Sequence, residues 1–521
     1  MRAARVPAKP LAQRWAAPLA IVAGAALYLA FPPVGWWPLA PVGVAAFTAA
    51  LHARSARGGF LLGLLTGAVF FVPLLDWSQF AGTNAWLLLA VGMAIYVGLL
   101  GALTTLVFRL PGWPLWAGAL WVGVEAIRGR VPFGGFTWGR LAFSQPQTAF
   151  TGWASLGGAP LVSFAVALSG AALAALWLEL RSADRPVLLA VAVVGVVAPI
   201  VATPARTAPR PVDTIRVAAV QGNVPRLGLD AFSQARQVLV NHADATAALV
   251  PTDDGQRPDL IIWPENSSDF DPFNDAPARS IITDAVRRAG IPILVGAILD
   301  GPGVKIRNAG ILWRPDSGPG EIYVKRHPVP FGEYIPLRRF LTPYFGRLAL
   351  VPHDQARGNT VGIFPLPTRN GSFGDVICFE VAYDDLMRDV VRAGARFIVV
   401  QTNNASFERL AETHQQLAIA RLRAVEHRRA VVVSATSGVT AVISADGTVL
   451  DSTSVFTRDV VLADLALPAP GVRTVADRVG AGPEWTLVAL ATAAVIAGVA
   501  IGRRERRPVE AIDTEPDAVL A

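Results

Sequence analysis

The sequence has one cysteine, Cys378, and few charged residues: these make up 16% of its 521 residues, whereas soluble domains carry about 25%. A single cysteine excludes an intramolecular disulfide framework and any metal site built from several cysteines. The shortage of charge is uneven, because apolar runs fill most of residues 15–203 and 485–502. The chain therefore joins a membrane part to a polar domain.

The net charge of +7 does not indicate a nucleic-acid partner. The basic residues cluster beside the apolar runs, where they set membrane orientation. The sequence shows neither a basic stripe with interleaved aromatics nor a zinc-finger or RNA-binding signature. We expect no nucleic acid, no metal and no cofactor.

The apolar runs predict eight membrane helices, since a helix needs about 20 mostly apolar residues to span a bilayer. The predicted spans are 15–32, 36–52, 58–75, 86–108, 111–126, 157–179, 186–203 and 485–502. The sequence thus divides into an N-terminal membrane domain (1–203, about seven helices), a proline-containing linker (204–213), a polar domain (214–475), a C-terminal membrane helix (485–502) and a cytoplasmic tail (503–521).

Basic residues predict the orientation of these spans. With the N-terminus in the cytoplasm, the basic clusters at the span ends fall on the cytoplasmic side, as the positive-inside rule requires. Seven spans then place the polar domain outside the cytoplasm. The exception is the loop 127–156, which carries Arg128, Arg130 and Arg140 on the outer side. This loop is rich in Gly and aromatics, and the sequence leaves open whether it lies in the membrane interface or is a structural loop.

The polar domain alternates short apolar runs with amphipathic stretches, which predicts an α/β fold. Strands are expected at 215–221, 259–263, 291–297, 306–313, 320–324, 373–378, 396–400, 430–435, 438–444 and 459–464. Helices are expected at 230–250, 276–289, 382–393 and 412–428.

Three polar residues stand at the carboxyl ends of predicted strands: Glu265 and Lys325 just beyond theirs, and Cys378 as the last residue of its strand. Ligands of α/β folds collect at that edge of the sheet, so the three side chains are expected to converge. Each alone is more often a cap, a solvated lysine or an inert core thiol. Together they could catalyse acyl transfer: the carboxylate would take the thiol proton, and the ammonium would stabilise the oxyanion of the tetrahedral intermediate. None of the histidines is required, which argues against a papain-like site.

The motifs WPEN (263–266), YVKRHPVPFGEYIP (323–336) and DVICFE (375–380) resemble those of the nitrilase, or carbon–nitrogen hydrolase, superfamily. That resemblance implies an αββα sandwich with a Glu-Lys-Cys triad. Set among membrane spans, and with the segment 125–145, the chain resembles the apolipoprotein N-acyltransferase family. The implied fold is a multi-pass α-helical membrane bundle plus an extracytoplasmic α/β nitrilase-like αββα sandwich domain.

The resemblance also implies residue roles. Glu265 is the general base, Lys325 the oxyanion stabiliser and Cys378 the nucleophile. The supporting residues are Glu333 beside the lysine, Glu380 beside the nucleophile, Phe379 through its backbone N–H, and Asn308.

The family reaction moves an acyl chain from a phospholipid, through a cysteine thioester, to the amine of a diacylglyceryl-cysteine on an apolipoprotein. The implied partners are thus a phospholipid donor, a diacylglyceryl apolipoprotein acceptor and membrane lipid, in a bacterial inner membrane. Pulling one C16 chain into water costs roughly 12 kcal/mol, which favours a triad placed beside the bilayer. The alternatives are a membrane-anchored nitrilase-type amidase, for which fewer spans would suffice, and a transporter, for which the spans hold few charges.

Two segments depart from the family pattern. A Ser-Asn-Asp-Ala-Trp-Phe run is replaced by TNNASF at 402–407, and an aromatic expected near 226–230 is missing. Both concern loops expected to contact lipid or substrate, so they bear on substrate detail and not on the triad.

Overall fold

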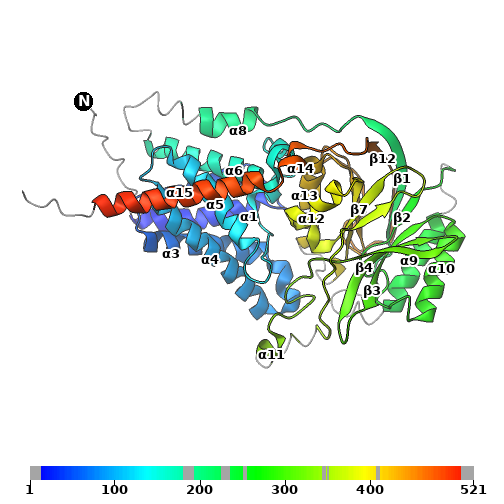
Figure 1. Ribbon diagram of the computed structural model, residues 1–521. Helices are drawn as coiled ribbons and strands as arrows, with labels where there is room; N and C mark the ends of the chain where they lie inside the picture. The colour runs from blue at the N-terminus through cyan, green and yellow to red at the C-terminus, as the bar shows by residue number, and fades with distance from the viewer. Residues whose placement is uncertain are drawn as a thin grey trace, which may run out of the picture.

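The computed structural model describes residues 13–179, 190, 193–224, 235–249, 255–342, 348, 351–405 and 411–505. It has two parts, a helical bundle and an α/β sandwich, and the last helix returns from the sandwich along the bundle (Figure 1). The departures predicted at 226–230 and at Ser406 and Phe407 lie outside the described residues.

Helices occupy each of the first six predicted spans. They are α1 (Ala16–Ala30), α2 (Leu39–Leu51), α3 (Ala56–Leu74), α4 (Thr83–Val107), α5 (Trp113–Arg128) and α6 (Ala154–Glu179), and α15 (Gly482–Glu505) covers the last. Within the described residues, four helices are long and apolar enough to cross a membrane: those at Ala56–Leu74, Thr83–Val107, Thr151–Leu178 and Gly482–Arg504. The predicted span 186–203 lies partly outside the described residues; its described end contains the π-helical turn Val193–Val197 and α8 (Ala198–Val201).

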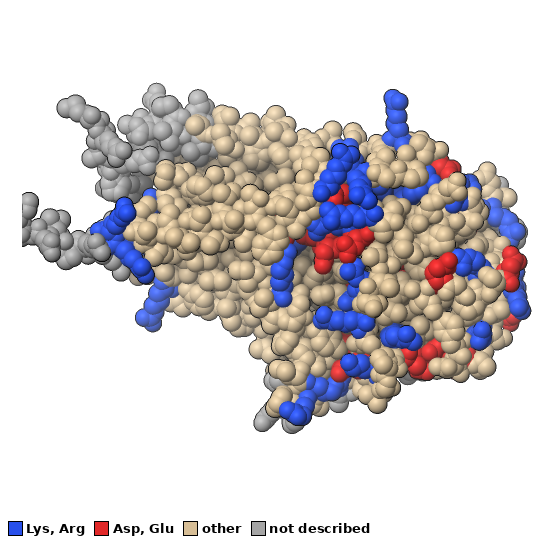
Figure 2. Space-filling view, viewed as in Figure 1, with Lys and Arg blue, Asp and Glu red and all other residues tan. Residues whose placement is uncertain are grey.

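Small residues let α3 and α4 approach closely. A Cβ placed on Gly63 would lie 2.3 Å from the carbonyl oxygen of Val97, and one on Gly59 would lie 2.6 Å from that of Gly101. Such close backbone contact is typical of helix pairs in membranes. The visible bundle surface is nearly free of charge between its two ends (Figure 2), as a lipid-facing band requires.

The polar domain consists of two six-stranded sheets. The first has the order β12-β1-β2-β3-β4-β5 and the second the order β11-β10-β9-β8-β7-β6. The strands are β1 (Pro211–Gln221), β2 (Leu260–Ile262), β3 (Ile293–Asp300), β4 (Ile306–Arg314), β5 (Gly318–Val324), β6 (Ile363–Pro365), β7 (Ser372–Ile377), β8 (Ala395–Thr402), β9 (Val431–Ala435), β10 (Ala441–Ile443), β11 (Val449–Ser452) and β12 (Asp459–Pro468). Two short edge strands, β6 and β11, were not predicted, and β1 begins inside the segment predicted as linker.

Helices cover the outer face of each sheet. On the first sheet lie α9 (Ala235–Leu249) and α10 (Ala276–Ala289), and on the second lie α12 (Asp384–Arg392) and α13 (Glu412–His427) (Figure 1). An apolar core that includes Ile262 and Val399 fills the space between the sheets. This arrangement confirms the predicted architecture of a helical membrane bundle joined to an αββα sandwich.

Residues 137–145 of the loop 127–156 are buried in the junction between the two parts, whereas Val131 and Phe133 are 54% and 42% exposed. Trp138 is 1% exposed, and Arg128 donates hydrogen bonds to the carbonyl oxygens of Phe136 and Trp138. Arg140 is buried and pairs with Asp384 of the sandwich at 2.8 Å. Two of the loop's three arginines are therefore buried among protein partners, and Arg130 is exposed.

Candidate active site

Glu265 lies three residues after the end of the short strand β2, where the chain leaves the first sheet. Its side chain is 4% exposed. Oε1 accepts hydrogen bonds from Lys325 Nζ at 3.0 Å and from Asn308 Nδ2 at 2.6 Å, while Oε2 accepts one from the Asn403 backbone N–H at 2.9 Å. These three bonds hold the carboxylate at the sheet edge in one orientation.

Lys325 follows directly after β5 and is fully buried. Its Nζ also donates to Glu333 Oε1 at 2.5 Å, and Glu333 is held in turn by the Val329 N–H at 2.8 Å. Burial alone lowers the pKa of Lys325, but the negative charges of Glu265 and Glu333 outweigh it and raise that pKa well above its usual value. Lys325 therefore stays a cation at neutral pH.

Cys378 begins the 3₁₀ turn Cys378–Ala382, immediately after β7, and not the end of the strand as predicted. Its φ of 56° lies in the left-handed region, which a residue with a side chain adopts only under strain. Thr402 Oγ1 lies 3.3 Å and Gln416 Nε2 3.7 Å from its Sγ. Burial, reinforced by the charge of Glu265, raises the pKa of the thiol well above its usual value. The resting thiol is therefore protonated and needs a base.

The base and the nucleophile are connected through two consecutive residues at the end of β8. Thr402 ends β8 and contacts the Cys378 sulfur, and Asn403 donates its backbone N–H to Glu265. The structure thus brings Glu265, Lys325 and Cys378 into one site, with Asn308 and Glu333 in direct contact with the first two.

Glu380 accepts hydrogen bonds from both segments that carry the candidate catalytic residues Lys325 and Cys378. Its carboxylate accepts hydrogen bonds from Tyr323 Oη (2.7 Å) and from the backbone N–H groups of Ile377 (2.8 Å), Arg326 (2.7 Å) and His327 (2.9 Å). These donors flank both Lys325 and Cys378 in sequence. Glu380 therefore fixes the strand ends that carry the ammonium and the thiol relative to each other.

Phe379 connects the nucleophile turn to the membrane part. Its ring stacks on Trp138 with centroids 4.7 Å apart, and it also packs against Phe136. Trp138 Nε1 donates to Gln415 Oε1 at 2.6 Å, so the same loop also binds α13. The position of the turn therefore depends on the loop 127–156.

Residues near the thiol that the sequence did not single out are Gln416 and Glu412 of α13. Gln416 Oε1 lies 3.0 Å from Thr402 Oγ1 and 3.1 Å from Asn404 Nδ2, which turns its amide nitrogen toward the sulfur. Asn404, one of the departures from the family pattern, also donates to Glu412 Oε2 at 2.6 Å. Burial raises the pKa of Glu412 to about 8. The helical pattern of 412–428 does not indicate a role for either residue, because their partners, Thr402 and Asn404, lie at the end of β8 and just after it.

In the described part of the chain, no group of three or more His, Cys, Asp or Glu side chains is placed to hold a metal ion. The chemistry that the site can perform is nucleophilic attack by a thiolate next to a fixed cation.

Family models match both parts of the chain. The apolipoprotein N-acyltransferase N-terminal domain matches residues 23–172, and carbon-nitrogen hydrolase matches residues 216–470. A protein from Mycolicibacterium smegmatis named apolipoprotein N-acyltransferase is 40% identical over 471 residues, which cover 84% of this chain and 77% of that protein. One of the same name from Geobacter metallireducens is 28% identical, covering 93% and 95%. A solved amidase of the nitrilase superfamily from Nesterenkonia shares 14% identity and a TM-score of 0.35, over 48% of this chain and 90% of its own.

Proposed function

The chain belongs to the apolipoprotein N-acyltransferase family, and from this premise we propose that Glu265, Lys325 and Cys378 carry out its acyl transfer. The protein is a membrane-associated acyltransferase of lipoprotein biosynthesis, with lipid and lipoprotein substrates. The donor in this proposal is a membrane phospholipid. The acceptor is the N-terminal amine of a diacylglyceryl-cysteine, which becomes triacylated. The observation that supports the proposal best is the buried Lys325–Glu265 pair next to the residues that contact the Cys378 sulfur.

In the first half-reaction Glu265 accepts the Cys378 proton, and the thiolate attacks the ester carbonyl of the phospholipid. Lys325 and the Phe379 N–H face the resulting oxyanion. The C–O bond then breaks, and the lysophospholipid alkoxide leaves with the proton held by Glu265. The product is a thioester on Cys378.

In the second half-reaction the lipoprotein amine attacks the thioester carbonyl. Its proton passes to Glu265, the C–S bond breaks, and the thiolate takes the proton back. An amide on the lipoprotein and the free thiol remain, so atoms and charges balance. Water must stay out while the thioester exists, and the burial of the three side chains favours this.

We place the protein in a bacterial inner membrane with the sandwich on the extracytoplasmic side, on the basis of the arginine distribution along the spans. In this placement the site lies beside the bilayer, where neither lipid-anchored substrate has to leave the membrane completely. A membrane-anchored amidase is not favoured, because the relatives match along the bundle as well as the sandwich and carry the acyltransferase name.

Intact-mass analysis after incubation with phospholipid tests the proposal. We expect the mass of one acyl group on the protein, its release by hydroxylamine, and its location on Cys378 after proteolysis. Cys378→Ala should insert in the membrane and remain unmodified. A stable acyl group on the Cys378→Ala protein would rule out the thioester mechanism.

A further inference from the structure

Four arginines gather where the sandwich meets the bundle: Arg388, Arg392, Arg473 and Arg478, here called the junction arginine cluster. Arg388 and Arg392 lie on α12, Arg478 lies on α14 (Val475–Val479), and Arg473 precedes it. Three are exposed, and Arg388 is half-buried. Figure 2 shows basic side chains massed over this part of the junction.

Five acidic residues around the cluster have partners of their own, while Asp385, at the start of α12, is exposed. Asp384 pairs with Arg140 and Arg423, Glu426 with Arg423, Glu484 with Arg130, Asp477 with His427 and Asp389 with Arg326. Within the described ranges, none of the cluster's four guanidinium groups forms an ion pair. Arg392 does donate to the backbone carbonyl oxygens of Asp477 and Arg478, and Arg473 to that of Arg392. These carbonyl groups are neutral, so the cluster keeps its positive charge.

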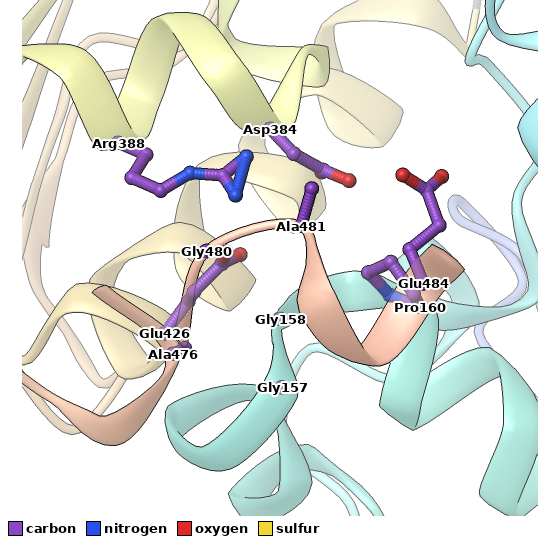
Figure 3. A pocket seen from close by; sticks show the side chains of 10 residues that line it. All are labelled: Gly157, Gly158, Pro160, Asp384, Arg388, Glu426, Ala476, Gly480, Ala481 and Glu484. Carbon is purple, nitrogen blue, oxygen red and sulfur yellow. The ribbon is translucent and has the colours of Figure 1, made fainter. Parts of the chain in front are cut away.

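Two of these groups converge on Gly480, the residue after α14. A Cβ on Gly480 would lie 2.9 Å from an Nη atom of Arg392 and 3.4 Å from one of Arg388. Figure 3 shows Arg388 reaching toward Ala481 and Asp384, in the pocket at the start of α15. The first turn of α15 adds the positive end of a helix dipole to this surface.

The cluster lies beside the start of an apolar helix that is long enough to cross a membrane. The apolar helix α15 begins at Gly482, and its Trp485 is 52% exposed, the usual place for an interfacial aromatic. Val475 and Val479 of α14 are each 46% exposed beside the arginines. At the surface of a bilayer, apolar acyl chains border on charged phosphate groups. The apolar side chains and the arginines at this span end have the same arrangement.

We propose that the junction arginine cluster binds the phosphate of anionic phospholipids in the leaflet next to the sandwich. Guanidinium groups bind phosphate oxygens through paired, charge-assisted hydrogen bonds. Bound lipid would hold α12, which follows the Cys378–Ala382 turn, against the bilayer. This inference concerns membrane attachment and does not depend on the proposed acyl transfer.

Native mass spectrometry of the full-length protein in detergent tests it, with dioleoylphosphatidylglycerol, dioleoylphosphatidylcholine and inorganic phosphate as separate probes. The test variant is R392Q/R473Q/R478Q. We expect its affinity for phosphatidylglycerol to fall about fivefold for each arginine removed, with phosphatidylcholine binding unchanged. Unchanged phosphatidylglycerol affinity would overturn the proposal.

Two controls separate charge from packing. R392K/R473K/R478K keeps the charge and should keep most of the binding; its failure would assign the effect to lost packing and overturn the proposal. R279Q/R287Q/R288Q removes three exposed arginines from α10, far from the junction, and should bind as the wild type does. Complete displacement of the lipid by millimolar inorganic phosphate would identify a free-phosphate site instead.

Discussion

Lys325 Nζ lies 3.0 Å from Oε1 of Glu265, and both side chains are almost completely buried. A buried charge is costly unless it is paired, so each residue requires the other. The pair also gives the site its chemistry, since one member can accept a proton while the other stays positive beside the developing oxyanion.

Glu265→Gln should abolish thioester formation, because the amide keeps the shape of the side chain but cannot take the Cys378 proton. We expect the acylation rate to fall by about 10²–10⁴-fold. The measurement is the rate at which a hydroxylamine-sensitive label from an alkyne-phospholipid appears. Glu321→Gln, an exposed glutamate of β5, is the matched control and should react normally. Normal labelling of the Glu265→Gln protein would exclude its role as base.

Lys325→Met removes the cation while keeping an unbranched side chain of similar length. Acylation should fall by about 10²–10³-fold, the usual cost of losing an oxyanion donor. The acylation rate is measured by labelling with the same donor and quenching the reaction at set times. Lys305→Met, at an exposed lysine, should leave the rate unchanged. A lysine variant with full acylation and lost stability would mean that Lys325 is only structural.

Glu412→Gln should change how stability depends on pH. The pKa of Glu412 is about 8 in the folded protein, above the roughly 4.3 of an unfolded chain. Between these values the folded state binds more protons, so the wild type loses stability as pH rises from about 5 to 8. Gln416 and Asn404 remain in place in the variant.

We therefore expect the thermal midpoint of Glu412→Gln, relative to the wild type, to be higher at pH 9 than at pH 6. Other buried carboxyls titrate in both proteins and cancel in the difference. Scanning fluorimetry in one detergent at both pH values measures it. A difference that does not vary with pH would show that Glu412 is ionised throughout.

Arg140→Gln should weaken the junction between bundle and sandwich. Arg140 lies 2.8 Å from Asp384, 3.7 Å from Glu125 and 3.8 Å from Glu484, and its removal leaves these buried acids undercompensated. Breaking a buried charge network of this kind costs on the order of 3–5 kcal/mol. Thermal unfolding and protease sensitivity measure the loss. Arg314→Gln, which breaks the more exposed pair with Glu321, should cost at most about 1 kcal/mol; an equal effect of both variants would contradict the role of the junction.

Much of the fold was predictable because its signals are local. Apolar runs predicted the first six helices of the bundle, and period-two and helical patterns predicted most strands and all four covering helices. The short edge strands β6 and β11 were missed, because three or four residues carry too little pattern to distinguish them from a loop. Cys378 was assigned to a strand, whereas its left-handed backbone is set by the turn that Glu380 holds.

The sequence by itself determined the two-part architecture, the apolar spans and the three candidate residues at strand ends, because periodicity, composition and short motifs are properties of neighbouring residues. Only the tertiary structure decided that Gln416 faces the thiol, that Phe379 stacks on Trp138, and that Trp138 and Arg140 of the loop 127–156 are buried in the junction. These contacts join segments far apart in the chain, and no local pattern encodes a distance between them.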